Sequence, residues 1–284
     1  MRLSVDCTAR SSSRPRQRRS SSPSRRSEET PRHSVTHTQT EMNIALVGYG
    51  KMGKEIDRIA GDYGATVGLR IDIDAPPLSE HDFTGIDTAI HFAIPSTVVP
   101  HVDELGVLGV NIVIGTTGWY GEIEKIRNIT KERNIGVLYG SNFSLGVNAF
   151  FYLVRKAGAL FNAFPEYDAF VHETHHREKI DAPSGTALTL GNILLKELKR
   201  KSELLTTVPE GKIKPEQLQI SSSRGGSVVG THRVVFDSPS DYLEFTHSAK
   251  SRSGFARGAL LAAEWIHGKK GFFTMDDLFA DVLR

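Results

Sequence analysis

The sequence predicts an α/β protein with two sheets. An N-terminal Rossmann-type domain with a parallel sheet precedes a C-terminal α+β domain with a mixed or antiparallel sheet. Strand-like and helical patterns alternate between residues 43 and 142, which is typical of a parallel sheet. A glycine-rich loop directly follows the first strand pattern, as in dinucleotide-binding folds. Strand patterns predominate at 216–246, which indicates a second sheet.

The first 41 residues differ in composition from the remainder. They hold nine Arg and four acidic residues (net +5), whereas 42–284 hold 26 basic and 29 acidic residues (net −3). Few of these 41 residues are apolar, so we expect a disordered basic tail rich in Ser and Arg. Three explanations remain open for this tail: an organelle transit peptide, translation from a start upstream of Met42, or a nucleic-acid-binding arm.

Composition also indicates the compartment. The single cysteine, Cys7, lies in the tail, so the folded part has no disulfide, as suits a reducing compartment. No run approaches the roughly 18 apolar residues of a membrane span. We therefore expect a cytoplasmic protein, or an organellar one if the tail is a transit peptide, with neither membrane nor nucleic acid as a partner.

The glycine-rich loop predicts a dinucleotide site. A strand pattern at 43–47 leads into G-x-G-x-x-G, and a helical pattern follows. Gly48 permits the tight turn, Gly50 lets the backbone approach a pyrophosphate, and Gly53 allows the helix to pack on the sheet. The helix N-terminus adds free amides and a positive dipole end. The predicted cofactor-binding residues here are Gly48, Tyr49, Gly50, Lys51, Met52 and Gly53.

An acidic residue stands where the cofactor ribose should bind. Asp72 ends a strand pattern at 66–72, about twenty residues after the glycines. Asp74 is the alternative. Neither is followed by a basic residue, because Ile73 comes after Asp72 and Ala75 after Asp74.

Further strands are predicted at 88–92, 111–114 and 135–139, with helices at 97–108 and 123–132. Ligands of open α/β sheets bind beyond the carboxyl ends of the strands. The loops at those ends should therefore line the cofactor site, and they contain Gly115, Thr116, Thr117, Gly140, Ser141, Asn142 and Phe143.

The pattern changes after Asn142. Helices are predicted at 147–161, 188–198 and 255–266, the last packing back on the first domain, and strands at 167–171, 216–221, 227–236 and 242–246. His232 and His247 stand alone in strand patterns, and we interpret both as structural.

The segment richest in candidate functional residues is the run from His172 to Ala187. It contains H-E-x-x-H, which on a helix would bind zinc. The residues before it alternate as a strand, and Pro183 with its neighbours signals a helix that begins after the motif. The alternative is a site for an anionic small molecule, with Gly185 and Thr186 in the first helical turn. His175, His176 and Lys179 would supply charge and protons, and we predict no metal.

The same run resembles the signature of the dihydrodipicolinate (4-hydroxy-tetrahydrodipicolinate) reductase family: Glu173-x-His175-His176-x-x-Lys179-x-Asp181-Ala182-Pro183-Ser184-Gly185-Thr186-Ala187. Gly115-Thr116-Thr117-Gly118 and Asn142-Phe143-Ser144-x-Gly146-Val147-Asn148 match further blocks in the same order. The resemblance extends from about residue 43 to the C-terminus, and the His-His to Gly-Thr block is its most specific part.

The resemblance implies NAD(P)H-dependent reduction of 4-hydroxy-tetrahydrodipicolinate, with loss of water, in the diaminopimelate pathway of lysine biosynthesis. It implies that His175 is the acid/base and Lys179 the proton donor, and that His176 with the Gly185 and Thr186 amides holds the carboxylates of a small dicarboxylate. It also implies a homotetramer. Residues 42–142, completed by about 252–284, would bind the dinucleotide, and 143–251 would bind substrate and form the oligomer.

Two departures from the family pattern concern the cofactor. Many members have one more residue in the glycine-rich loop, and many have a basic residue after the strand-two acid, where this chain has Ile73. We predict NADH as the preferred cofactor, with NADPH possible. Three other functions remain open: a different hydride-transfer enzyme on the same scaffold, a non-catalytic cofactor-binding regulator, and a zinc hydrolase.

Overall fold

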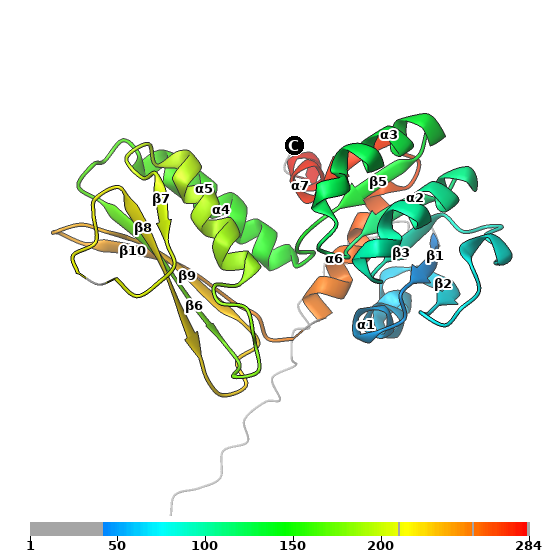
Figure 1. The fold of residues 1–284 in the computed structure, drawn as a ribbon, viewed down its shortest axis with the longest axis horizontal. Helices are drawn as coiled ribbons and strands as arrows, with labels where there is room; N and C mark the ends of the chain where they lie inside the picture. Colours follow the sequence, from blue (N-terminus) through cyan, green and yellow to red (C-terminus); the bar gives the residue numbers. More distant parts are fainter. Residues whose placement is uncertain (1–41, 210, 252, 283–284) are drawn as a thin grey trace, which may run out of the picture. The chain divides into compact units, whose positions relative to one another are not determined.

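The first sheet has six parallel strands in the order β11-β5-β4-β3-β1-β2 (Figure 1). The computed structural model describes residues 42–209, 211–251 and 253–282. The tail predicted at 1–41 lies outside them. The strands of this sheet are β1 (Met42–Val47), β2 (Ala65–Ile71), β3 (Thr88–His91), β4 (Asn111–Ile114), β5 (Gly136–Tyr139) and β11 (Gly271–Thr274).

Helices cover both faces of this sheet. In β1, Ile44 and Leu46 point to one face and Ala45 and Val47 to the other, and all four are buried. The first face packs against α1 (Lys51–Ala60) and α6 (Ser253–Ile266). The second face packs against α2 (Val98–Val107) and α3 (Ile123–Arg133). Burial on both faces explains why the strands are continuous apolar runs rather than alternating ones.

The chain returns to the first sheet near its C-terminus. The helix predicted at 255–266 is present as α6. The structure adds β11, which pairs in parallel with β5, and α7 (Met275–Val282). Neither of these two elements was predicted.

The second sheet has five strands in the order β10-β9-β6-β8-β7. Its central strand, β6 (Asp168–His175), is antiparallel to β9 (Thr231–Asp237) and parallel to β8 (Gln217–Arg224). The predicted combination of a parallel first sheet and a mixed second sheet is therefore confirmed. The edge strands are β7 (Glu203–Leu205) and β10 (Tyr242–Ser248).

Helices α4 (Leu145–Phe161) and α5 (Gly185–Glu197) lie together over one face of the second sheet (Figure 1). Strand β6 extends four residues beyond its predicted end and brings His175 to its last position. Helix α5 begins three residues earlier than predicted, directly after Ser184. Short 3-10 helices occupy Gly61–Tyr63, Leu78–Glu80, Pro95–Thr97 and Tyr120–Glu122.

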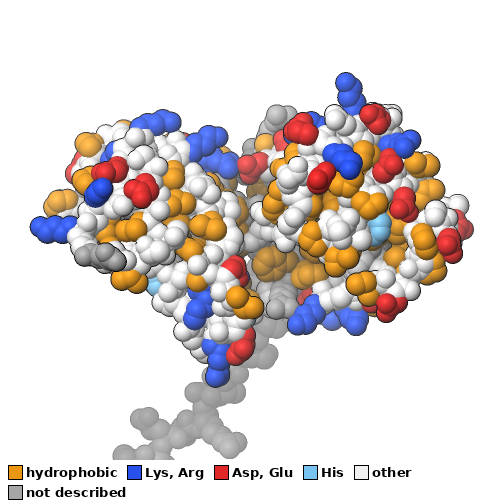
Figure 2. Space-filling model, viewed as in Figure 1, with side chains coloured by type: hydrophobic (Ala, Val, Ile, Leu, Met, Phe, Trp, Pro, Cys, Tyr) orange, Lys and Arg blue, Asp and Glu red, His pale blue; other side chains and the backbone are white. Residues whose placement is uncertain are grey.

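Two further properties concern the apolar character of the described helices and the distribution of charge on the surface. None of the described helices is both long and apolar enough to span a lipid bilayer. On the face drawn in Figure 2, Lys and Arg side chains are interspersed with Asp and Glu.

Candidate active site

The glycine-rich loop has the geometry that its sequence predicts. Gly48 has φ +99°, and a Cβ there would lie 2.3 Å from the carbonyl oxygen of Phe92. A Cβ on Gly53 would lie 2.4 Å from the carbonyl oxygen of Gly48. Gly50 precedes the first residue of α1, and a Cβ there would meet nothing within 4 Å. The loop is therefore tight on two sides and open at Gly50, where the amides of α1 can receive an anion.

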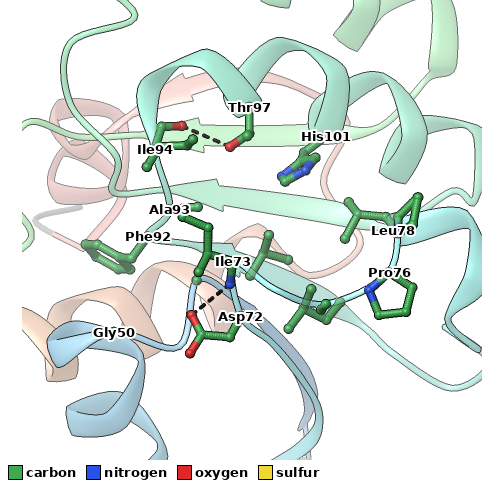
Figure 3. Close-up of a pocket in the computed structure, with 15 residues that line it drawn as sticks. Gly50, Asp72, Ile73, Pro76, Leu78, Phe92, Ala93, Ile94, Thr97 and His101 are labelled. Atoms are coloured by element: carbon green, nitrogen blue, oxygen red, sulfur yellow. Dashed lines mark hydrogen bonds between the residues drawn. The ribbon is translucent and has the colours of Figure 1, made fainter.

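A cavity of about 480 Å³ extends from this loop past the end of β2. Asp72 stands at its mouth, and its Oδ1 accepts a 2.9 Å hydrogen bond from the amide of Ile73 (Figure 3). The remaining wall is mostly apolar, with Pro76, Leu78 and Ile94, while Thr97 and His101 approach from α2 and the turn before it. None of the described residues that line this cavity is a Lys or Arg. The cavity suits the adenosine half of a dinucleotide, with Asp72 as an acceptor for ribose hydroxyls.

Strand β2 has one basic residue, Arg70, and its guanidinium forms an ion pair with Asp57. Arg70 donates two hydrogen bonds of 2.7 Å to the carboxylate of Asp57 on α1. The hydroxyl of Tyr49 donates to the same carboxylate. The hydrogen bonds from Arg70 hold the pKa of Asp57 below its ordinary value. Lys51 and Met52 lie in the first turn of α1.

The loop after β4 contacts a buried histidine, His91. The Nδ1 of His91 lies 2.8 Å from the Oγ1 of Thr116, and its Nε2 lies 3.1 Å from the Nδ1 of His101. Burial lowers the pKa of His91 to about 3, and the neighbouring His101 adds to this effect. Gly115 packs so closely on Phe92 that a Cβ would come within 2.1 Å of the ring. Thr117 lies beside them and is exposed.

The loop after β5 leads from the first sheet into α4 and contacts the first turn of α5. Asn142 donates from its Nδ2 to the Oγ1 of Thr186 at 3.4 Å, and its Oδ1 accepts from the amide of Ser144 at 2.8 Å. Phe143 is buried edge-on against Phe92, with 6.0 Å between ring centroids. Gly140 is buried and Ser141 is exposed.

The His-rich run alternates between the two faces of β6. Glu173 and His175 are buried on the face covered by α4 and α5, whereas His172 points to the opposite face, where its Nδ1 lies 2.8 Å from the Oγ of Ser221. Residues 172–175 are strand and His176 follows it. The zincin motif requires a helix that places both histidines on one face, so the H-E-x-x-H segment does not form that site.

Glu173 is fully buried at the centre of a polar cluster. Its Oε1 accepts hydrogen bonds from the Ser184 amide (3.0 Å), the Ser222 hydroxyl (2.8 Å) and the Arg224 guanidinium (2.9 Å). Its Oε2 faces the imidazoles of two histidines, His175 and His232. Burial by itself would raise the pKa of Glu173, but the hydrogen bonds around it hold the pKa well below the ordinary range.

Of the residues in this cluster, the sequence assigns a catalytic role to His175 alone. Glu173 enters only through the zinc motif and the family signature, without a role of its own, and Arg224 and Ser222 are not singled out. His232 was interpreted as structural, yet its Nε2 lies 3.1 Å from the hydroxyl of Ser184 at the start of α5. A period of two along β6 was the available signal, since it puts Glu173 on the face of His175.

His175 is an almost fully buried imidazole, with a side-chain exposure of 8%. Burial lowers its pKa to about 4, against an opposing attraction from Glu173. His175 is therefore neutral at pH 7 and has one ring nitrogen free to accept a proton.

The remaining predicted site residues lie in the loop between β6 and α5 and in the first turn of α5. The amide of His176 donates to the carbonyl of Val228 at 2.7 Å. Lys179 is partly exposed and donates from its Nζ to Asp181 at 2.7 Å. Ser184 caps α5 by accepting from the amide of Ala187 at 3.3 Å. Gly185 is exposed, and a Cβ there would meet nothing within 4 Å.

A metal is one candidate for the buried cluster, because Glu173, His175 and His232 each offer a ligand atom within 4.8 Å of the others. However, Arg224 donates to the same carboxylate at 2.9 Å, so a cation there would meet an adjacent positive charge. We therefore interpret the cluster as a hydrogen-bonded carboxylate with two imidazoles.

A parallel sheet with a glycine-rich turn, followed by a domain that presents imidazole, ammonium and helix amides, defines an NAD(P)-dependent oxidoreductase. Residues 42–143 match the family described as "Dihydrodipicolinate reductase, N-terminus", and residues 146–279 match "Dihydrodipicolinate reductase, C-terminus". The chain belongs to the dihydrodipicolinate (4-hydroxy-tetrahydrodipicolinate) reductase family, and the resemblance seen in its motifs is confirmed.

Two curated relatives match over most of their length. The 4-hydroxy-tetrahydrodipicolinate reductase of Christiangramia forsetii is 38% identical over 86% of this chain and 100% of its own. That of Cupriavidus necator is 33% identical over 84% of this chain and 98% of its own. Among solved structures, a dipicolinate-bound dihydrodipicolinate reductase from Paenisporosarcina sp. TG-14 superposes with a TM-score of 0.67. It covers 84% of this chain and 99% of its own at 19% identity, which is a likeness of fold.

Proposed function

We propose that the chain reduces 4-hydroxy-tetrahydrodipicolinate to tetrahydrodipicolinate, with loss of water, in the diaminopimelate route to lysine. The observation that carries this proposal is the match to curated reductases over their whole length. A coupled assay tests it: a 4-hydroxy-tetrahydrodipicolinate synthase supplies the substrate, and NADH oxidation is followed by absorbance. Oxidation that depends on the synthase product supports the function, and its absence contradicts it.

The dicarboxylate would bind at the start of α5. Free amides and the positive dipole end of a helix favour a carboxylate, and the space beside Gly185 is open. Thr186 lies in the same turn, within reach of Asn142. Lys179, from the loop between β6 and α5, would add positive charge toward a second carboxylate, and a ring N–H of His176 in the same loop would donate a hydrogen bond to it. This set matches a small dianion better than a neutral substrate.

Proton transfer would fall to His175 and Lys179. When bound, the nicotinamide supplies the hydride. His175 is neutral at pH 7 and buried beside the substrate turn, so it can accept or return a proton at one ring nitrogen. Lys179 carries three donor hydrogens and is close enough to His175 for its charge to lower the pKa of that imidazole. Lys179 would deliver the proton that completes the reduction.

NADH would be the preferred cofactor, with NADPH as a poorer alternative. The residues present fit a dinucleotide, since Gly50 leaves room for phosphates and Asp72 offers an acceptor at the cavity mouth. A 2′-phosphate would meet the Asp72 carboxylate there, and the part of the lining that the structure describes offers no Lys or Arg to bind it. The Gly115–Thr117 and Gly140–Phe143 loops would border the nicotinamide half.

We also propose that 42–142, completed by about 252–284, binds the dinucleotide, and that 143–251 binds substrate and forms a homotetramer. No described helix covers the face of β6 that carries Phe170, which is 39% exposed. Tyr242 on β10 is 66% exposed. Exposed apolar side chains on an uncovered sheet favour self-association. Mass measurement in solution tests this, and a monomer of unchanged mass at micromolar concentration contradicts it.

The enzyme would act in the cytoplasm. The absence of cysteine from 42–284 suits a reducing compartment. The alternative is an organelle, if residues 1–41 are a transit peptide. Imaging of the full chain and of a chain that begins at Met42, each fused to a fluorescent protein at the C-terminus, distinguishes the two.

A further inference from the structure

The two carboxylate oxygens of Glu173 have different neighbours, and this difference suggests a role. Oε1 accepts three hydrogen bonds from protein donors, at 2.8–3.0 Å. Oε2 is buried and accepts none from the residues that the structure describes. Burying a carboxylate oxygen without a hydrogen-bond donor costs free energy. The groups that face Oε2 are therefore its candidate donors.

The Oε1 side holds the substrate turn. One of its donors is the amide of Ser184, the residue whose hydroxyl caps α5. A second donor, Arg224, also donates to the carbonyl oxygen of Asp181 at 2.6 Å. Arg224 therefore holds the start of the segment 181–184 and Glu173 holds its end, directly before Gly185.

The Oε2 side faces two imidazoles. It lies 3.4 Å from the Nδ1 of His175 and 3.5 Å from the Nε2 of His232. The Nδ1 of His175 is buried and has no hydrogen-bond partner among the described residues. A proton on this Nδ1 would point at Oε2 and leave Nε2 as the bare nitrogen. The Nε2 edge of the ring passes beside Gly230, where a Cβ would come within 2.9 Å of it.

We propose that Glu173 is a positioning residue: its Oε2 fixes His175 in the tautomer with the proton on Nδ1, and its Oε1 fixes the substrate turn relative to that imidazole. The carboxylate acts through His175 and does not touch the substrate. The proton on Nδ1 stays in place while Nε2 accepts or returns the proton of the reaction, as a carboxylate-oriented imidazole does in other enzymes. The inference rests on the proposed role of His175.

Several charges act on His175 at once. They come from Glu173 on β6, His232 on β9, Lys179 in the loop after β6 and Arg224 on β8. Among these groups only Glu173 favours the protonated imidazole; the other three disfavour it. Removing the negative charge of Glu173 therefore leaves His175 harder to protonate.

The first test is the tautomer of His175, read by ¹⁵N NMR of histidine-labelled protein at neutral pH without substrate. A His175→Asn variant assigns the signals. We expect the proton on Nδ1 in the unaltered protein, and a proton on Nε2 would overturn the proposal without any change at Glu173. This readout needs no turnover, so it is independent of whether the proposed reaction is correct.

Glu173→Gln provides the decisive variant. The three donors around Oε1 orient the amide oxygen of Gln toward them, so its NH₂ replaces Oε2 and faces His175. An NH₂ donor requires a bare Nδ1, and we expect the proton to move to Nε2. An unchanged tautomer in a folded E173Q protein would contradict the proposal.

Kinetics separate positioning from simple loss of structure. We expect E173Q to lower kcat by about 100-fold or more and to move the His175 ionisation in the kcat/KM profile to lower pH by about one unit or more. Ser222→Ala is the matched control, because it removes one hydrogen bond to Oε1 and leaves Oε2 unchanged. It should lower the melting temperature yet keep the wild-type pH profile. Identical profiles in E173Q and the unaltered enzyme would overturn the proposal, whereas an inactive unaltered enzyme would contradict the proposed function instead.

Discussion

The ammonium of Lys179 is held by a carboxylate from its own loop: its Nζ lies 2.7 Å from the Oδ1 of Asp181. This hydrogen bond lowers the pKa of Asp181 and keeps that side chain ionised. The pair is partly exposed, so its contribution to stability is small. The hydrogen bond restrains the ammonium within the loop between β6 and α5, where its charge acts on His175.

Replacing Lys179 with Ala should lower kcat by about 10²–10⁴-fold, the range for loss of a positioned proton donor, and His175→Ala should do likewise. Asp181→Asn should cost less, because the ammonium remains. Steady-state kinetics measure these effects, and NADH binding, measured by fluorescence, should stay nearly unchanged. Unchanged turnover in both Lys179→Ala and His175→Ala would reject their assigned roles.

Cofactor preference follows from the cavity beside Asp72. Because the lining residues within 42–209, 211–251 and 253–282 include no Lys or Arg, kcat/KM should be higher with NADH than with NADPH. An Ile73→Arg variant should raise kcat/KM for NADPH, since its guanidinium can meet a 2′-phosphate. Ile73 is exposed, so this change should not affect folding. A tenfold or greater preference of the unaltered enzyme for NADPH would contradict the prediction.

Two glycines of one loop should respond differently to the same change. Gly50→Ala meets nothing within 4 Å, so the protein should fold normally and bind NADH more weakly, because the methyl group occupies space needed by the phosphates. Gly53→Ala brings a Cβ to 2.4 Å from the carbonyl of Gly48, so its melting temperature should fall. Calorimetry and NADH titration separate the two effects. Equal losses of stability would contradict the assignment of Gly50 to phosphate binding.

Stability should decrease in mild acid because of two buried imidazoles. The pKa of His91 is lowered to about 3 and that of His175 to about 4, whereas the unfolded chain binds these protons near pH 6.5. Their contribution is complete above about pH 6.5 and is lost progressively as the pH falls toward the folded values. For one imidazole the loss at pH 5 is about 2 kcal/mol.

Urea unfolding between about pH 5 and 7.5 measures this dependence. His91→Gln should reduce the slope of unfolding free energy against pH by about one proton. A slope that His91→Gln does not alter would contradict the contribution assigned to this imidazole.

Much of the fold could be predicted because its signals are local. In the first loop, Gly48 and Gly53 are required by close contacts with the carbonyl oxygens of Phe92 and Gly48, respectively. The strands of the first sheet are buried on both faces and therefore read as apolar runs. By contrast, β11 has four residues, all of intermediate burial, and exists only because it pairs with β5. No periodicity in the sequence could reveal that pairing.

The candidate site was predicted unevenly for a similar reason. The run from His175 to Thr186 is continuous in sequence, so its residue types predict an anion site. The cluster beneath it draws on β6, β8, β9 and the cap of α5. Ser222, Arg224 and His232 come together with Glu173 only through strand pairing, and one sequence does not specify which strands become neighbours.

The late return of the chain to its first sheet has a consequence for synthesis. Residues 42–139, which contain five strands of the first sheet, are translated first. In the complete fold, apolar residues of these strands, such as Ile44 and Leu46, pack in one core with Ala259 and Leu260 of α6. That helix and β11 are translated only after the whole of 143–251. Until then, the first sheet lacks α6 on one of its faces, and the edge of β5 has no partner strand. Uncovered apolar surface and unpaired strand edges make nascent chains prone to aggregate. Chaperone dependence during translation is expected to be concentrated in that interval.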